Sequence, residues 1–566
     1  MGDIKDLFEN VDNVQLKLAF EFIQYTNKNI FLTGKAGTGK TTFLKSLKEN
    51  LPKRMIVVAP TGVAAINAGG VTIHSFFQLP FGPQIPLDNE NKSENAFKRN
   101  NYKFNITKID IIKSLDLLVI DEISMVRADL LDGIDEVLRR YKEKDKFFGG
   151  VQLLMIGDLQ QLSPVVRDSE WEILKSYYDN MYFFSSRALK STQCICVELK
   201  HIYRQKDDYF IDLLNKVRNN ELSADTLNKI NKRFEEKFTK DVPEGYIILT
   251  THNSKAQKIN GFKLKQLKTD EFIFEAEIEG NFPENSYPIE YTLSFKKGAQ
   301  VMFVKNDTSA EKLFYNGKIG KIENIKDNII YVKCENENDY IEVTPVEWEN
   351  IKYTINNENK EIESKVEGRF TQFPLRLAWS ITIHKSQGLT FEKAIIDAKN
   401  AFSHGQVYVA LSRCKTLEGL FLNSKISSEC IINDKIVTDF TNKIGLDTPD
   451  RLLLEKSKYE YQKILLLDLF EFSNIARLFG YCLKIYRENK GSLQQSFYDV
   501  ADKILNLINN DLIIVSKKFE TQIEKILEFD QDIENNKKLN ERIKKACAYF
   551  REKIENNILK SLKDIN

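Results

Sequence analysis

A glycine-rich stretch near the N-terminus has the residue types and spacing needed to hold a phosphate group. Gly34, Gly39, Lys40 and Thr41 satisfy the pattern G-x-x-x-x-G-K-[ST], between an apolar strand-like segment and a helix-like segment. Glycines let backbone N–H groups approach an anion, the lysine adds a positive charge, and the threonine hydroxyl can ligate magnesium. The residues expected to bind ATP are Gly34, Lys35, Ala36, Gly37, Thr38, Gly39, Lys40, Thr41 and Thr42.

Gln15 lies upstream of this loop on a segment with helical spacing. Its amide could reach an adenine edge, and an ordinary solvated helix glutamine fits the spacing equally well. We include Gln15 among the expected nucleotide contacts and leave both interpretations open.

Two further buried strands end in polar side chains that suit nucleotide hydrolysis. Apolar residues 117–120 precede Asp121 and Glu122, of which one carboxylate can support magnesium while the other accepts a proton from water. Strand 151–156 ends before Gln161, whose neutral amide can sense a γ-phosphate. An Asp-Glu pair at a strand end is common, but the phosphate loop upstream favours the catalytic interpretation.

These segments must be positioned by a parallel sheet. Strands end near residues 33, 59, 120 and 156 with helices between them, which predicts a doubly wound α/β fold. Thr61 and Gly62 then open a helix at the carboxyl edge of the sheet, where ligands of such folds bind. The pattern of Thr72, His74 and Phe76 is that of an ordinary strand, and residues 79–114 read as a small protruding insertion.

Bulk properties bound the class of protein. The chain has 566 residues, enough for two to four domains, and its net charge of +1 neither favours nor excludes nucleic acid. No apolar run is long enough for a membrane span, and the N-terminus lacks the apolar core of a secretory signal. The 7 cysteines are scattered, so we expect a reducing, cytoplasmic location.

The later part of the chain changes character twice. Short strands with turn signals between 293 and 372 predict a small β-barrel inserted into the second half. Residues 451–566 are rich in Leu, Ile, Lys and Glu and predict three or four helices, as a bundle docked on the core or folding on itself in preference to a module that binds a partner or DNA. The apolar stripe expected to be buried there is Leu465, Leu469, Phe472, Ile475, Leu478, Phe479 and Cys482.

Several segments together resemble a known family. Residues 34–41 (GKAGTGKT), 60–65 (PTGVAA), 120–125 (IDEISM) and 157–165 (GDLQQLSPV) are similar to the first motifs of PIF-type DNA helicases, superfamily 1B enzymes related to RecD-like helicases. The later motifs of that family resemble residues 198–205 (ELKHIYRQ), 247–253 (IILTTHN), 377–388 (LAWSITIHKSQG) and 406–414 (QVYVALSRC). The resemblance covers roughly residues 10–440.

The resemblance implies a fold of two RecA-like P-loop parallel-sheet cores, a small SH3-like β-barrel insertion and a C-terminal α-helical extension. The corresponding domains are 1–195 with an insertion at about 79–114, 196–445 with the SH3-like insertion at about 293–372, and 451–566. If arginines from the second core complete the phosphate site, hydrolysis requires the two cores to close on one another.

The resemblance also implies the activity, an ATP-dependent DNA helicase that moves 5′-to-3′ on single-stranded DNA. Taken singly, Arg204 and Arg413 would be surface ion-pair residues, and only the motif context makes them arginine fingers. The expected catalytic residues are Lys40, Asp121, Glu122, Gln161, Arg204 and Arg413, with Mg²⁺ at Thr41 and Asp121. The expected DNA contacts are Thr61, Gly62, Thr72, His74, Thr382, His384, Lys385 and Ser386.

Single-stranded DNA and duplex or fork DNA are the expected partners, with roles in DNA repair, recombination or genome maintenance. We expect a monomeric core that is nucleoid-associated if the organism is bacterial, and a protein partner through the C-terminal helices. Two alternatives stay open. One is a RecD-like recombination motor inside a complex, and the other is a nucleotide-gated DNA-binding or scaffold ATPase.

Overall fold

The computed structural model describes residues 13–86, 104–205, 207–236, 243–307, 309, 311, 313–335, 339–355, 362–397, 399, 401, 404–432, 434–446, 448–489 and 495–563. The chain divides into two compact units. The larger holds residues 1–24 and 28–449, and the smaller holds residues 25–27 and 450–566. Each unit is described by itself.

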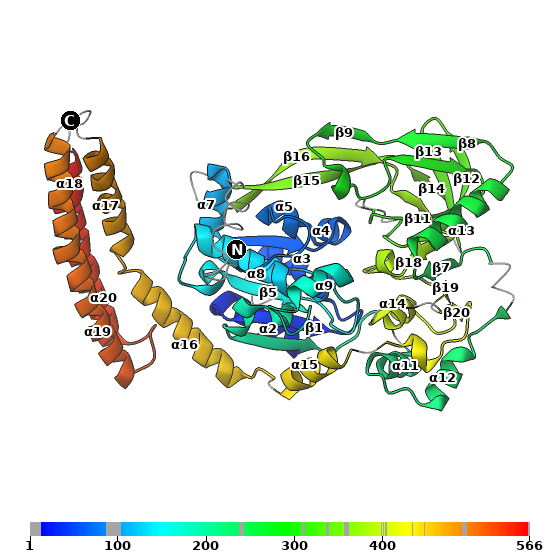
Figure 1. Cartoon of the computed structure of the whole chain (residues 1–566), viewed down its shortest axis with the longest axis horizontal. Coiled ribbons are helices and arrows are strands. Elements are labelled where there is room, and N and C mark those ends of the chain that lie inside the picture. The colour runs from blue at the N-terminus through cyan, green and yellow to red at the C-terminus, as the bar shows by residue number, and fades with distance from the viewer. Residues whose placement is uncertain are drawn as a thin grey trace. The chain divides into compact units, whose positions relative to one another are not determined.

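The first lobe of the larger unit is built on a parallel sheet of six strands in the order β3-β2-β4-β5-β1-β6 (Figure 1). Every residue of its central strands β1, β4 and β5 is buried, as expected for a sheet covered on both faces. The four strand ends predicted from the sequence are confirmed. The strands are β1 Asn29–Gly34, β2 Met55–Ala59, β3 Val71–Thr72, β4 Leu117–Ile120, β5 Gln152–Ile156 and β6 Cys194–Leu199.

Helices cover both faces of this sheet. Two expectations are wrong here. Residues 73–77 form a short helix instead of a strand, because the Thr72 hydroxyl caps it by accepting from the Ser75 N–H at 3.2 Å. Helix α7, at the end of the predicted insertion 79–114, contributes Ile111 and Ile112 to the core and so belongs to the lobe, while residues 87–103 of that insertion lie outside the described residues. The helices are α2 Val14–Tyr25, α3 Lys40–Asn50, α4 Gly62–Ala68, α5 Ile73–Phe77, α7 Ile106–Ser114, α8 Ala128–Tyr141, α9 Asp168–Leu174 and α10 Arg187–Lys190.

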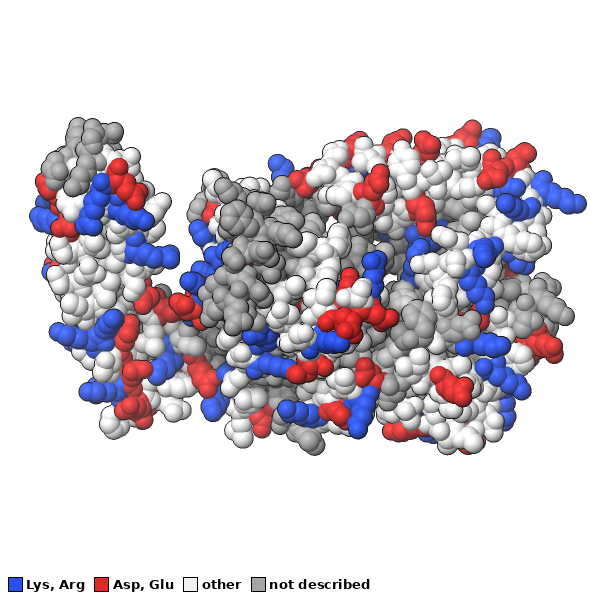
Figure 2. Space-filling model, viewed as in Figure 1, with Lys and Arg blue, Asp and Glu red and all other residues white. Residues whose placement is uncertain are grey.

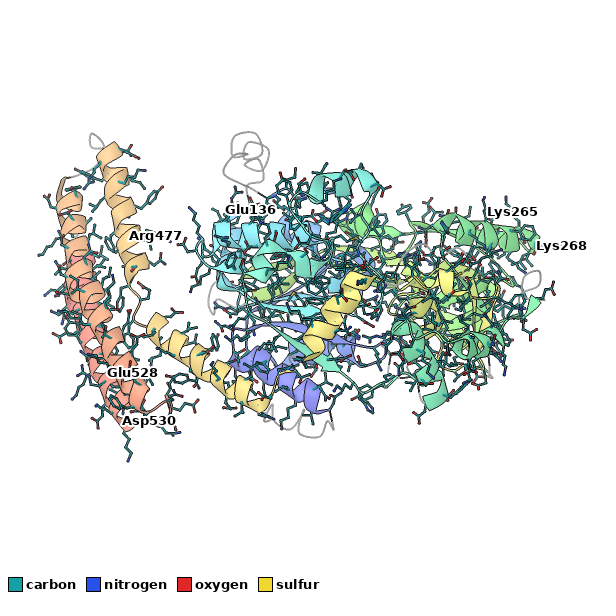
Figure 3. All side chains as sticks on the ribbon, turned by 60° about the horizontal axis from the view of Figure 1, so that its bottom comes forward. Glu136, Lys265, Lys268, Arg477, Glu528 and Asp530 are labelled. Atoms are coloured by element: carbon teal, nitrogen blue, oxygen red, sulfur yellow. The ribbon has the colours of Figure 1, made fainter. Side chains whose placement is uncertain are left out.

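The second lobe has a smaller parallel sheet in the order β18-β7-β19-β20. Its core combines these strands with helices α11 and α14, and includes Phe210, Leu249 and Val409. The strands are β7 Ile247–Thr250, β18 Ser380–Thr382, β19 Ala394–Asp397 and β20 Leu420–Leu422. The helices are α11 Asp208–Arg218, α12 Ala224–Asn231, α13 Asn253–Gln266 and α14 Gln406–Ser412. Lys265 and Lys268 lie at the outer end of α13 (Figure 3).

Antiparallel strands form the insertion between β7 and β18. The described strands make an open sheet β14-β13-β12-β11-β17, a sheet β15-β16-β9 and a pair β10-β8, where we expected a closed barrel beginning near 293. The insertion therefore starts earlier, because β8 and β9 pair with β10 and β16. The strands are β8 Glu271–Glu275, β9 Glu277–Gly280, β10 Thr292–Lys296, β11 Gln300–Phe303, β12 Ile319–Lys326, β13 Ile329–Cys334, β14 Tyr340–Val343, β15 Val346–Ile355, β16 Ile362–Gln372 and β17 Leu375–Leu377.

The expected boundaries between the two lobes need correction. A boundary at 195 would cut β6, which pairs with β1 from Asn29 to Gly34. Helix α15 (Lys435–Leu446) returns to the first lobe instead of the second, since Val437 lies in the first-lobe core and the Phe440 ring stacks on Phe184 at 3.9 Å. The chain thus starts and ends this unit on the same lobe.

The smaller unit is helical, as predicted. Its described helices are α16 Arg451–Asp468, α17 Ser473–Glu488, α18 Gln495–Leu507, α19 Ile514–Phe529, α20 Lys537–Lys553 and α21 Lys560–Lys563, with π-helical turns at Ile508–Ile513 and Ile554–Leu559 joining α18 to α19 and α20 to α21. Arg477 marks α17, and Glu528 and Asp530 mark the end of α19 (Figure 3).

The predicted apolar stripe of this unit is wrong in most of its members. Leu465, Leu469 and Leu478 are exposed, and the core uses Leu466, Phe470 and Leu483 instead. Of the predicted residues, Phe472 is buried and Phe479 packs against the core. Within the described residues, no helix is both long enough and apolar enough to span a membrane.

Candidate nucleotide and DNA site

The phosphate loop connects β1 to α3 in a tight turn. Gly37 and Gly39 have φ values of 82° and 88°, which favour glycine. The Lys40 ammonium donates to the carbonyl oxygens of Gly34 at 2.6 Å and Lys35 at 3.0 Å, and burial lowers its pKa. Thr41 and Thr42 are exposed in the first turn of α3. The loop is thus a preformed turn with a desolvated cation at its centre.

The segment after β6 covers this loop. The Tyr203 N–H donates to the Gly37 carbonyl at 2.8 Å, and a Cβ on Gly37 would come within 2.4 Å of the Arg204 Cβ. Burial lowers the pKa of Arg204, and its buried Nη1 has no hydrogen-bond partner among the described residues. A buried, unpartnered guanidinium nitrogen beside a glycine loop is an anion-binding arrangement.

Two carboxylates lie at the end of β4. Glu122 has a φ of 52°, which non-glycine residues rarely adopt, and accepts from the Gln387 side chain at 2.8 Å. Burial and then the Asp121 charge raise the pKa of Glu122 to about 7, and burial raises that of Asp121 to about 6. A carboxylate that titrates near neutrality suits a proton acceptor.

Gln161 and Arg413 meet across the two lobes. The Gln161 side-chain nitrogen donates to Asp158 Oδ2 at 3.2 Å, and its oxygen accepts from Arg413 Nη2 at 3.4 Å. Arg413 is 2% exposed, and burial followed by the nearby Arg204 lowers its pKa to about 9. The charges of Glu122 and Arg204 both act on Lys40, so the structure brings the expected catalytic residues into one cluster.

The acidic pair fits a magnesium ion. Asp121 and Glu122 repel one another and sit where a cation would relieve the repulsion. Within the described part of the chain, no group of three or more His, Cys, Asp or Glu side chains could hold a metal alone. Mg²⁺ keeps waters and phosphate oxygens among its ligands, so Thr41 and Asp121 would supply only part of its coordination.

The expected DNA contacts of the first lobe lie near the carboxyl ends of β2 and β3. Thr61 is exposed and caps α4, Gly62 is half-buried, and Thr72 caps α5. His74 Nδ1 lies 3.1 Å from the Leu79 carbonyl oxygen, which orients its ring, and the exposed Phe81 ring lies 4.5 Å from it.

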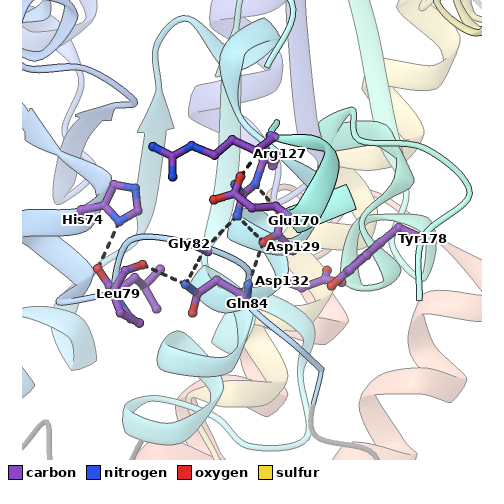
Figure 4. A network of polar contacts seen from close by, with 11 residues as sticks. His74, Leu79, Gly82, Gln84, Arg127, Asp129, Asp132, Glu170 and Tyr178 are labelled. Atoms are coloured by element: carbon purple, nitrogen blue, oxygen red, sulfur yellow. Dashed lines mark hydrogen bonds and ion pairs between the residues drawn. The ribbon is translucent and has the colours of Figure 1, made fainter. Parts of the chain in front are cut away.

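The loop behind His74 is fixed by a polar network (Figure 4). Arg127 donates to the Gly82 carbonyl at 2.8 Å and to Asp129 at 2.7 Å, and the Gln84 N–H donates to Asp129 at 2.8 Å. Because Asp129 is buried, this ion pair holds residues 79–86 firmly against α8.

The expected contacts of the second lobe divide into two kinds. Lys385 is exposed and His384 is half-buried, but Thr382 and Ser386 are buried. The Ser386 hydroxyl donates to the Ile383 carbonyl at 2.7 Å, and the Thr382 hydroxyl accepts from the Lys385 N–H at 3.3 Å. Both hydroxyls hold the turn His384–Ser386 together, and their expected DNA contacts stay predictions, since Thr382 also lines a groove with Lys385.

A groove of about 320 Å³ runs beside Lys385. Its lining includes Asn253 and Asn260 of α13, with Arg376 and Glu290 opposite. Elsewhere, on the face shown in Figure 2, the coloured residues intersperse basic and acidic side chains without a broad basic patch. In the groove itself, the basic Lys385 and Arg376 share the lining with the acidic Glu290.

Comparison with known proteins decides the family. Residues 11–228 match a family model described as PIF1-like helicase. The chain is 30% identical over 402 residues to the ATP-dependent DNA helicase Pif1 of Campylobacter jejuni, a match that covers 68% of this chain and 86% of that protein. This chain belongs to the PIF1-like helicase family.

Solved structures of the family agree with the fold. Bacteroides sp Pif1 in complex with ADP-AlF4 is 42% identical, with a TM-score of 0.71 over 77% of this chain and 98% of that one. Bacteroides Pif1 bound to ssDNA has the same 42% identity and a TM-score of 0.55 over 76% and 97%. The parallel-sheet cores with added antiparallel sheets are therefore those of Pif1 helicases.

Two comparisons show how much of the relatives and of this chain is matched. The PIF1 helicases of Candida albicans and Homo sapiens are longer, and this chain spans 53% and 58% of their lengths. The C-terminal helices match a different model, described as DNA helicase, middle domain, over residues 453–566.

Reasoning from the PIF1-like motifs missed three residues of the cluster. Asp158 is buried and accepts from Arg218 Nη2 at 3.1 Å, and the Tyr408 hydroxyl accepts from the Ala36 N–H at 3.3 Å. Asp158 and Tyr408 lie within the motifs at residues 157–165 and 406–414, so the resemblance could have identified both as site residues. Arg218 is the last residue of an amphipathic helix, where a basic residue is ordinary, so no local pattern identifies it. Gln15 is half-buried on α2, and its expected adenine contact stays a prediction.

Proposed function

We propose that this chain is an ATP-dependent DNA helicase that moves 5′-to-3′ along single-stranded DNA and separates duplexes. One observation carries the proposal. Arg204 lies beside Gly37 of the phosphate loop with a buried Nη1 that has no hydrogen-bond partner among the described residues, and the buried Arg413 of the second lobe reaches Gln161 of the first. A site completed by the closing of two lobes converts nucleotide turnover into relative movement of those lobes.

The side chains divide the chemistry of hydrolysis. The phosphate loop and Lys40 hold the β- and γ-phosphates, and Glu122 accepts a proton from the attacking water. Gln161, Arg204 and Arg413 stabilise charge on the transferred group, an effect worth about 10³–10⁵ in rate for arginine fingers. Thr41 and Asp121 would hold Mg²⁺, which when bound neutralises phosphate charge.

The side chains expected to contact DNA come from the same two lobes. Thr61, Gly62, Thr72 and His74 of the first lobe and His384 and Lys385 of the second present small polar or singly charged groups, with Thr382 and Ser386 supporting their turn. Such groups suit phosphate contacts, which position a strand without reading its sequence. Solved structures of relatives concern Bacteroides Pif1 bound to ssDNA and the unwinding of forked dsDNA by two Pif1 helicases, and we extend both kinds of DNA to this chain.

The domain boundaries, the cellular role and the location are proposed together with the function. We propose a first domain through β6 and α15, a second domain containing the β-insertion, and the helical extension 451–566. A role in repair, recombination or genome maintenance, a cytoplasmic location, a monomeric core and a protein partner of the helical extension stay predictions.

Strand displacement tests the proposal. Duplexes with a 5′ or a 3′ single-stranded tail are incubated with ATP and magnesium, with Lys40→Ala as the blank and Lys45→Ala, exposed on α3, as the matched control. We expect unwinding only from the 5′ tail, lost in Lys40→Ala and kept in Lys45→Ala. Unwinding from the 3′ tail would contradict the polarity.

Other outcomes favour the alternatives. DNA-stimulated ATP turnover without unwinding would favour a motor that works in a complex, as in RecD-like enzymes. ATP turnover that DNA does not stimulate would favour a nucleotide-gated scaffold.

A further inference from the structure

A buried ion pair joins the two lobes near the phosphate loop, where both of its charges act on Lys35 and Lys40. Arg218, the last residue of α11, donates from Nη2 to Asp158 Oδ1 at 3.1 Å, and the two side chains are 7% and 0% exposed. Arg218 Nε is also buried and has no partner among the described residues. Because burying such a pair costs about as much as the attraction returns, stability alone does not account for it.

The ion pair is the first contact of a relay, by which we mean the hydrogen bonds that lead from Arg218 through Asp158 and Gln161 to Arg413. Asp158 Oδ1 also accepts from the Gln160 N–H at 3.1 Å, and Oδ2 accepts from the Gln161 side-chain nitrogen at 3.2 Å. The Gln161 oxygen accepts from Arg413 Nη2 at 3.4 Å. A glutamine amide has one donating and one accepting end, so a carboxylate at one side and a guanidinium at the other leave it a single favourable orientation.

The relay crosses between the lobes twice, from Arg218 to Asp158 and from Gln161 to Arg413. Two neighbouring contacts make these hydrogen bonds depend on closure of the lobes. A Cβ on Gly405 would lie 2.1 Å from the Gln161 carbonyl oxygen, so only glycine permits this approach. His404 Nε2 lies 3.1 Å from the Leu159 carbonyl oxygen. The second lobe therefore closes directly on the loop that carries Asp158 and Gln161.

We propose that Arg218 is a positioning residue for ATP hydrolysis, which holds Asp158 when the lobes close so that the Gln161 amide faces Arg413. This inference rests on the proposed function. Arg218 does not touch the phosphate loop in this structure by any hydrogen bond described. Without it, Asp158 loses its hydrogen-bonded cation, and the Gln161 amide loses its anchored partner.

Steady-state ATP turnover with single-stranded DNA tests the assignment. Arg218→Ala is expected to lower kcat by on the order of 10²-fold, as for misplaced catalytic groups, with little change in KM. Arg218→Lys, which keeps the charge, should recover part of this loss. Lys216→Ala is the matched control, because Lys216 lies on the same helix in an ion pair with Asp212 at 2.6 Å and its side chain is 35% exposed.

A double-mutant comparison distinguishes positioning from a structural role. If Arg218 acts through Asp158 and Gln161, adding Arg218→Ala to Gln161→Ala should change kcat by less than about threefold. An equal loss of kcat in both backgrounds would overturn the inference, as would an unchanged kcat for Arg218→Ala. Should Arg218→Ala fail to fold, Arg218→Gln enters the same comparison. Absence of turnover in the unmodified chain would instead refute the proposed function, and this inference with it.

Discussion

Charged side chains are buried between the two lobes, while large apolar side chains are exposed on the C-terminal helices. Arg413 and Asp158 are 2% and 1% exposed, whereas Leu469 and Phe529 are 71% and 92% exposed. Buried charge costs folding free energy, and exposed apolar area contributes little to it. The comparison teaches that the charges between the lobes serve the reaction, so neutral substitutions of the same shape there should change the reaction rate more than the stability. In the helical unit, stability should change only at buried positions.

The largest expected effect tests the inter-lobe half of this comparison. Glu122→Gln removes the proton acceptor while keeping the shape that receives the Gln387 hydrogen bond. General base catalysis contributes about 10²–10⁴-fold, so DNA-stimulated kcat should fall by that order while nucleotide binding persists. The melting temperature should stay equal or rise, because the repulsion with Asp121 disappears. Rate is measured by phosphate release and stability by calorimetry, with the partly exposed Glu143→Gln as the control.

A variant that keeps its rate but loses stability would reverse the interpretation of this site. Glu122 would then be a structural carboxylate, and its left-handed backbone would reflect local packing.

The helical unit offers a matched pair of neighbouring residues. Phe470 is 3% exposed and packs on Phe519 with ring centroids 4.9 Å apart, while Leu469 is 71% exposed. Phe470→Ala should destabilise this unit by about 3–5 kcal/mol, and Leu469→Ala by about 0.5 kcal/mol or less. Hydrogen exchange of α19 and α20 reports the unit separately from the lobes. Comparable losses at both positions would show that the Leu469 face is covered in solution.

The nucleotide site was predictable because its motifs carry their structural context with them. A strand, glycines at two fixed positions and a helix leave one arrangement for residues 34–41, and the strands that deliver Glu122 and Gln161 read as continuous apolar runs. Arg218 could not be found this way, because its partner Asp158 is distant in sequence and only the closed lobes bring them together.

Periodicity failed where two faces of a segment are equally apolar. Residues 464–470 read ILLLDLF, so either Leu465 and Leu469 or Leu466 and Phe470 could face the core. Packing against Phe519 and Phe550 selects the second pair, a tertiary choice invisible to spacing. The turn that Thr382 and Ser386 stabilise was missed for a related reason, since residue spacing does not show that local backbone groups already bond both hydroxyls.

The smallest expected effect concerns Lys385, whose exposed charge is neither a charge buried between the lobes nor an apolar residue of the helical unit. Lys385 lines the groove beside α13 and has Arg376 and Glu290 as charged neighbours. Lys385→Ala should leave stability unchanged and reduce the slope of log K against log salt for single-stranded DNA by about 0.7, the value for one phosphate contact. Fluorescence anisotropy with a labelled oligonucleotide across a salt series measures the slope. Lys265→Ala, at the outer end of α13, is the control (Figure 3). Equal slope changes for both lysines would mean that Lys385 acts only through general charge, and the groove would lose its assignment as the path of the strand.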